Sequence, residues 1–194
     1  MASNTIPLFP LNTVLFPGGP LKLRIFETRY VDMVGRCMRE DVGFGVALII
    51  EGVEAGGSAR TASVGTLARI VDFEPLKDGL LGITAHGQQR FRIDLARQQS
   101  DGLNLAEVEW IADEPAQLVP EEYSVLADLS RQAFPQLAAL YGNIEPAYDD
   151  ATWVGMRLAE MLPLGVEDRQ QCLEIQDARE RLKYLSERIR IERV

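Results

Sequence analysis

The opening of the chain constrains the fold more than any other stretch. Residues 6–20 read IPLFPLNTVLFPGGP, in which four prolines and two glycines punctuate large apolar side chains. Each proline fixes its φ at about −65° and removes a backbone donor, so strands built here begin and end at set places and resist extra pairing. Pro17-Gly18-Gly19 predicts a turn that reverses the chain. The segment therefore indicates short, pinned β-strands and not a proline-rich ligand motif.

Strand signals continue to about residue 112. Apolar residues alternate with polar ones after Pro20, and FGVALII (44–50) is a continuous apolar run that suits a strand buried on both faces. Turns are expected at Asp78-Gly79 and at His86-Gly87. Many short strands separated by turn signals indicate a barrel or a sandwich. The expected strands are residues 21–26, 44–50, 65–76, 81–85, 91–95 and 106–110.

One helix interrupts the strands. Tyr30, Met33, Val34 and Cys37 follow the i, i+3, i+4, i+7 spacing of an apolar helix face, and Thr28 is the predicted N-cap. The glycine-rich segment that follows the 44–50 strand, residues 51–60, is expected to be a mobile loop.

From residue 113 onward the pattern becomes helical. Acidic residues after Pro120 favour a helix start there, and Pro135 is expected to kink or split that helix. A second helix is expected from Asp149 or Asp150 to residue 162, and a third segment over 166–194 with a break near Asp177. We therefore predict an α+β fold, with a β-rich half at 1–112 joined through residues 113–120 to a helical half at 113–194.

Charge and composition restrict the partners. The formal net charge of −9 opposes phosphate backbones, which argues against nucleic acid and against an anionic membrane as partner. No apolar stretch approaches the roughly 20 residues that span a bilayer, and the first residues lack the pattern of a signal peptide. The expected location is the cytoplasm, where Cys37 and Cys172 are expected to be buried free thiols.

No catalytic, cofactor-binding or metal-binding residue is predicted. Phosphate-binding loops need a Gly-Lys-Ser or Gly-Lys-Thr ending that GGSAR (56–60) lacks, and GFGVAL (43–48) lacks the third glycine of a dinucleotide fingerprint. The single histidine, His86, cannot build a zinc site or a histidine-based triad without partners. The three lysines, Lys22, Lys77 and Lys183, are assigned to solvent. The chain is therefore expected not to be an enzyme and to use no cofactor.

Two sets of charged residues could suggest a functional site, but helix capping or exposure to solvent explains them. The pairs Glu121-Glu122 and Asp149-Asp150 stand at expected helix starts, where exposed amides stabilise negative charge, so we assign them to helix capping. Arg24 and Arg29 flank one end of a strand and could form an anion site, but solvated strand and helix faces are the more common outcome.

Three segments in the same order resemble the LON domain, the N-terminal substrate-binding domain of the ATP-dependent protease Lon. Residues 6–34 contain Phe-Pro-Gly before an alternating strand and a helix, and residues 64–93 contain a Gly-Thr-Leu strand and a hairpin. Residues 161–189 contain Leu-Pro-Leu before the last helices. The resemblance implies a PUA-like pseudo-barrel in 1–112 followed by a helical bundle in 113–194. The ATPase and the serine-lysine protease of Lon are not expected here, because the sequence ends at Val194.

The resemblance implies a recognition function without catalysis. The chain is expected to bind polypeptide, either an unfolded chain or a partner protein, as a recognition or adaptor module. The alternative is a structural protein that self-associates or docks a partner through its last helix, and a cryptic hydrolase is a third hypothesis. Two heptads fall short of the roughly three to four of a coiled coil, so this helix is expected to pack on its own domain. The heptad positions are Ile175, Ala178, Leu182, Leu185 and Ile189.

Overall fold

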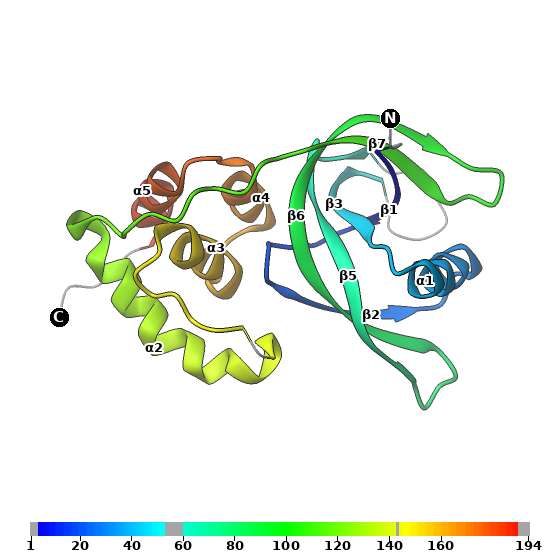
Figure 1. The fold of residues 1–194 in the computed structure, drawn as a ribbon, viewed down its shortest axis with the longest axis horizontal. Helices are drawn as coiled ribbons and strands as arrows, with labels where there is room; N and C mark the ends of the chain where they lie inside the picture. The colour runs from blue at the N-terminus through cyan, green and yellow to red at the C-terminus, as the bar shows by residue number, and fades with distance from the viewer. Residues whose placement is uncertain (1–3, 53–59, 143, 190–194) are drawn as a thin grey trace. The chain divides into compact units, whose positions relative to one another are not determined.

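The chain divides into two compact units, residues 1–112 and 113–194 (Figure 1). The computed structural model describes residues 4–52, 60–142 and 144–189. Most of the loop expected at 51–60 therefore lies outside the described residues. The first unit contains the strands and one helix, α1, and the second contains the remaining helices. This arrangement confirms the α+β class.

The strands of the first unit close into a ring. Neighbouring strands follow the order β1-β7-β6-β5-β3, and β1 also pairs in parallel with β3, which joins the two ends. Strand β2 pairs antiparallel with β6 outside this ring, and β4 pairs with β3. The predicted pseudo-barrel is therefore present. The bounds are β1 Thr5–Leu11, β2 Pro20–Ile25, α1 Thr28–Glu40, β3 Phe44–Glu51, β4 Arg60–Thr61, β5 Val64–Pro75, β6 Leu81–Gln98 and β7 Asn104–Trp110.

Strand β1 shows why prolines suit the start of this chain. Its first half pairs with β7, where Pro7 lies opposite Leu105, and its second half pairs with β3, where Pro10 lies opposite Ala47. The two registers overlap only at Leu8. Each proline therefore has a neighbouring strand on one side only. A strand at such a position can lack one N–H without losing a hydrogen bond to its neighbour.

The turn expected at His86-Gly87 is wrong, because β6 runs through both residues. The Gly18 amide donates to the Gly87 carbonyl at 2.8 Å, and the Gly87 amide donates to the Gly19 carbonyl at 2.9 Å. A Cβ on Gly87 would lie 2.1 Å from the carbonyl oxygen of Phe16. Glycine is needed here for a close approach of two backbones, which the local sequence cannot distinguish from a turn.

Helix α1 presents its predicted face to the barrel core. Tyr30, Met33, Val34 and Cys37 are all buried in one cluster with residues of the sheet. The predicted N-cap is wrong by one residue: Thr28 is already helical, and the capping position is Glu27, which makes no side-chain cap bond. The Glu27 carboxylate instead pairs with the Arg29 guanidinium at 2.9 Å.

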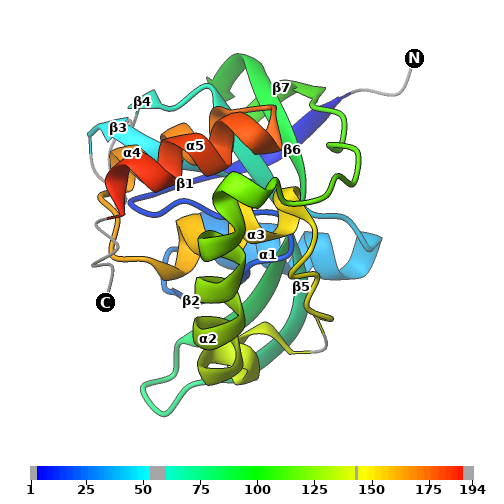
Figure 2. The ribbon, with the colours of Figure 1, turned by 90° about the vertical axis from the view of Figure 1, so that its left-hand side faces the viewer.

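In the second unit, α3 packs against α2, α4 and α5 (Figure 2). Pro135 lies inside α2, which continues as one helix and is not split. The Phe134 ring beside it packs against Tyr141 and Trp153 with 5.0 Å between ring centroids in each pair. The expected break near Asp177 is present. The bounds are η1 Glu121–Tyr123, α2 Ser124–Tyr141, α3 Ala151–Met161, α4 Val166–Glu174 and α5 Ala178–Arg188.

Only one of the two carboxylate pairs caps a helix. Asp150 accepts from the amides of Thr152 and Trp153 at 2.7 and 3.0 Å and so caps α3. Glu121 and Glu122 do stand in the first turn of a helix, η1, but the capping part of the assignment is wrong, because η1 has no side-chain cap bond and Glu122 pairs with Arg179. At the other end of the unit, the heptad residues Ala178, Leu182 and Leu185 are fully buried, and α5 packs on α3 and α4.

Candidate functional site

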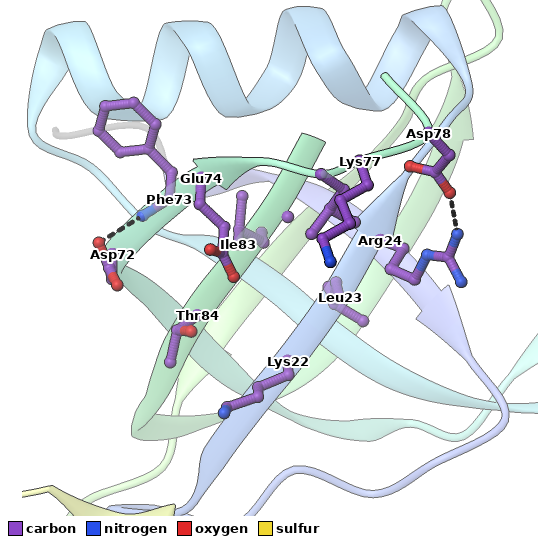
Figure 3. A pocket seen from close by; sticks show the side chains of 12 residues that line it. Lys22, Leu23, Arg24, Asp72, Phe73, Glu74, Lys77, Asp78, Ile83 and Thr84 are labelled. Atoms are coloured by element: carbon purple, nitrogen blue, oxygen red, sulfur yellow. Dashed lines mark hydrogen bonds and ion pairs between the residues drawn. The ribbon is translucent and has the colours of Figure 1, made fainter. Parts of the chain in front are cut away.

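A groove of about 550 Å³ crosses the sheet where β2, β6 and β5 lie side by side (Figure 3). We call it the hairpin groove, because the turn between β5 and β6 forms one of its ends. All of its residues belong to the first unit. It is lined by Lys22, Leu23, Arg24, Asp72, Phe73, Glu74, Leu76, Lys77, Asp78, Gly82, Ile83 and Thr84.

Strand register places opposite charges on opposite sides of this groove. Because β6 pairs with β2 on one side and with β5 on the other, residues of the three strands form cross-strand rows. In each row β2 contributes an exposed cation, β6 a small or hydroxyl residue, and β5 an exposed carboxylate. The two rows are Lys22–Thr84–Asp72 and Arg24–Gly82–Glu74.

One ion pair fixes the end of the hairpin groove. Arg24 pairs with Asp78 at the β5–β6 turn, as the dashed line in Figure 3 shows. The Leu80 amide donates to Asp78 at 3.2 Å, and this bond together with the Arg24 guanidinium holds the pKa of Asp78 below its usual value. Gly79 has a φ of 82°, as the predicted Asp78-Gly79 turn requires. Within the described residues Lys22 and Lys77 form no ion pair.

Apolar side chains also line the hairpin groove. Leu76 folds over Gly82, since a Cβ on that glycine would lie 3.0 Å from a methyl group of Leu76. Phe73 pairs with Ile83 across the strands and, by the alternation of the strand, lies on the opposite face from the charged rows. The groove thus combines the apolar Leu76 with charges of both signs.

A second groove, of about 330 Å³, follows the free edge of β2. We call it the edge groove. It is lined by the consecutive residues 22–27 together with Phe9, Leu11 and Tyr30, and the rings of Phe9 and Tyr30 stack with centroids 3.8 Å apart. In the part of the chain that the structure describes, β2 pairs only with β6, and β1 beyond Leu8 pairs only with β3.

The nucleophile candidates of the sequence are exposed lysines and buried thiols. Lys22, Lys77 and Lys183 are exposed, as expected. Burial raises the pKa of the Cys37 thiol and raises that of Cys172 to about 11, so both buried, free thiols are poor nucleophiles. Over residues 4–52, 60–142 and 144–189, no group of three or more His, Cys, Asp or Glu side chains could hold a metal ion.

The anion site considered for Arg24 and Arg29 is not formed. Arg24 pairs with Asp78, while Arg29 pairs with Glu27 and donates to the Gly102 carbonyl at 2.7 Å. The expectation of a solvated Arg29 is also wrong, because only 10% of its side chain is exposed. The local sequence patterns did not predict the acidic side of the hairpin groove, although the Asp78-Gly79 turn signal brings β5 and β6 together there. None of the described helices is both long and apolar enough to cross a membrane.

Comparison with known proteins gives the family. Residues 5–190 match the family model of the ATP-dependent protease La (LON) substrate-binding domain. The chain belongs to this family. The predicted resemblance is therefore confirmed over nearly the whole sequence.

Individual relatives agree with this assignment. The chain is 25% identical over 190 residues to Lon protease 2 of Myxococcus xanthus, covering 94% of this chain and 23% of the relative. It is 31% identical over 130 residues to cereblon of Danio rerio, covering 65% of this chain and 29% of the relative. The chain thus spans about a quarter of the length of the curated Lon proteases it matches.

Two solved structures share the fold. A crystal structure of a Lon N-terminal domain protein from Xanthomonas campestris is 37% identical with a TM-score of 0.80, covering 94% of this chain and 97% of that one. The N-terminal domain of a Lon protease from the Mycobacterium avium complex is 17% identical with a TM-score of 0.66, covering 94% and 96%, and shows the fold alone.

Proposed function

We propose that this member of the LON substrate-binding family is a non-catalytic module that binds polypeptide, as an unfolded chain or as an exposed segment of a partner protein. The observation that carries the proposal is the pair of open grooves on either side of β2, in a domain whose family is described as substrate-binding. Their volumes fall in the range of about 300–1,000 Å³ typical of ligand sites. A polypeptide offers the mixture of apolar and charged groups that these grooves would match.

Other parts of the proposal follow from charge and burial. The net charge of −9 favours a protein partner over a nucleic acid. The two buried free thiols suit a reducing cytoplasm, and the proposed binding needs no cofactor. The alternative of self-association through the last helix has less support, because the apolar face of α5 is buried within the protein.

Binding of an unfolded protein tests the proposal directly. A reduced, carboxymethylated and dye-labelled protein should raise its fluorescence anisotropy saturably as this chain is added, while the same protein in its folded form should not compete. If no unfolded polypeptide binds at concentrations up to about 100 µM, where the binding free energy is still only about −5.5 kcal/mol, the proposed function is wrong.

A matched pair of variants tests the location. Leu76 lies over Gly82 in the hairpin groove, whereas Leu118 in the second unit is 80% exposed and lies outside both grooves. Leu76→Asp should weaken binding about tenfold by removing apolar contact, and Leu118→Asp should not change it. Equal loss in both variants, or in neither, would place binding elsewhere on the molecule.

A further inference from the structure

We propose that the bound segment is extended, alternates apolar with acidic residues, and adds as a strand to the free edge of β2. This inference rests on the proposed function and specifies the kind of polypeptide that the edge groove recognises. It follows from the open backbone of β2, the alternation of its side chains, and the sign of its charges.

The backbone of β2 has one unused side. In an antiparallel pair every second residue directs its N–H and C=O away from the partner, and β2 pairs antiparallel with β6 over Pro20–Ile25. Among the described residues no strand takes up the groups on the other side. The proline of β2 stands at its first position, so the later amides keep their hydrogens. An extended peptide can therefore form ladder hydrogen bonds in the edge groove.

The side chains of β2 specify what the added strand carries. Leu21 and Ile25 are buried in the barrel core, and Leu23 packs against the same cluster. On the other face stand Pro20 and two exposed cations, Lys22 and Arg24. Residues opposite one another on neighbouring strands pair by type, so apolar residues of the segment would lie beside Leu23 and acidic ones beside the two cations.

The charges of β2 and the net charge of the whole chain have opposite effects on an acidic peptide. A net charge of −9 attracts basic peptides and repels acidic ones at long range. A preference for acidic segments must therefore come from Lys22 and Arg24 themselves. Arg24 already pairs with Asp78, but a guanidinium has five donors, and Lys22 forms no ion pair in the described parts of the chain. The competing explanation is that Pro20 and these cations protect the edge from pairing, as charged residues do on many edge strands.

Two ten-residue peptides with identical apolar residues at alternate positions separate these explanations. One carries Glu and the other Lys at the intervening positions, and fluorescence anisotropy measures their Kd. The acidic peptide should bind the protein at least about fivefold more tightly, and Lys22→Glu should reverse the preference. Lys183→Glu, at an exposed position on α5, is the matched control and should change neither Kd. Circular dichroism checks that both variants are folded.

N-methylated peptides test the strand pairing. Methylation of alternate amides removes every donor on one edge of an extended peptide, so two versions of the acidic peptide block its two edges in turn. Strand addition predicts that one version loses at least tenfold in affinity while the other binds like the parent peptide. Equal binding of both versions would overturn the proposal.

The outcomes separate this inference from the proposed function. If an unfolded protein binds but neither Lys22→Glu nor methylation has an effect, the β2 edge is not the site, while the polypeptide-binding function stands. If no polypeptide binds, both fail. If sedimentation shows a dimer that Lys22→Glu dissociates, the edge pairs with a second copy, and the proposed occupant is wrong.

Discussion

The two units of this protein bury charge in different ways. Among the described residues of the first unit, the buried polar or charged ones are Thr66 and Arg90, and the cations and carboxylates that line the hairpin groove are exposed. The second unit, although shorter, buries Ser130, Arg157, Gln170 and Arg181. The barrel is held by a closed ring of strands around an apolar core, and the charged side chains of the hairpin groove remain exposed. The helical unit depends on a few buried ionic groups, and substitutions there should cost more.

Arg181 shows this dependence most clearly. Its fully buried guanidinium donates to both carboxylate oxygens of Glu114, at 2.5 and 2.9 Å, and to the carbonyls of Cys172 and Ile175. Its stem packs on α3 at Gly155, where a Cβ would lie 3.0 Å from the Arg181 Cδ. One side chain therefore connects the segment after residue 112 to α3 and to the α4–α5 connection.

The most extensive change separates the two units. We propose that residues 1–112 and 113–194 are distinct folding domains, and that 1–112 expressed alone retains the barrel, because its ring of strands closes within those residues. Circular dichroism and a cooperative thermal transition would show this. A fragment 1–112 without a cooperative transition would contradict it.

Replacing Arg181 should be the most destabilising single change. Arg181→Met leaves the Glu114 carboxylate buried without its cation, and should lower the free energy of unfolding by about 3–5 kcal/mol. Urea denaturation measures the loss. The control is Arg179→Met on the same helix, where the exposed pair with Glu122 should contribute less than about 1 kcal/mol. Similar losses in the two variants would mean that the buried ion pair contributes no more to the unfolding free energy than the exposed one.

In the barrel, backbone contact should matter more than charge. Gly87→Ala drives a methyl group into the Phe16 carbonyl and should cost at least about 2 kcal/mol of unfolding free energy. Gly35→Ala in α1 meets only the end of the Arg39 side chain, at 3.3 Å, and should stabilise the protein by up to about 1 kcal/mol through helix propensity. Denaturation midpoints that move in the same direction would refute the close-approach explanation of Gly87.

The cap of α3 should have a moderate effect. Asp150→Ala removes the acceptor for two amides and should lower the unfolding free energy by about 1 kcal/mol. Its neighbour Asp149 pairs with Arg131 at 2.6 Å on the surface, so Asp149→Ala should cost less than about 0.5 kcal/mol. Thermal unfolding measures both losses. A larger loss in Asp149→Ala than in Asp150→Ala would mean that Asp150 is not the cap of α3.

The smallest expected effect is a dependence on pH. Burial raises the pKa of Glu160 above its ordinary 4.5, despite the Arg157 guanidinium at 2.8 Å. The folded state therefore holds this proton more tightly, so the associated stability is present below about pH 4.5 and is lost as pH rises through the raised pKa. Glu160→Gln should remove this slope from a plot of unfolding free energy against pH.

Asp168 provides the opposite sign in the same unit. Its bonds from Arg188 and Tyr184 hold its pKa below the usual value, so the stability it gives is lost as pH falls through the lowered pKa. Asp168→Asn should therefore flatten the acid side of the same plot. Slopes of equal sign in the two variants would contradict these assignments.

Local patterns predicted the elements well where one face of an element is buried. The spacing of Tyr30, Met33, Val34 and Cys37 identified the buried side of α1, because helical period and burial coincide there. The prediction failed at Gly87, where the reason for glycine is the backbone of Phe16, about 70 residues earlier in the chain. It also failed to find the candidate site, because the charged rows exist only once β2 and β5 lie on either side of β6.

The sequence by itself determined the strand-rich and helical halves, the short strands delimited by proline at the start of the chain, and the family. These depend on the order and spacing of residues along the chain. The tertiary structure decided that β1 joins both ends of the sheet and that β2 keeps a free edge. Both depend on which strands become neighbours, and pairing between distant segments is set by the packing of the whole barrel, not by the preferences of any one strand.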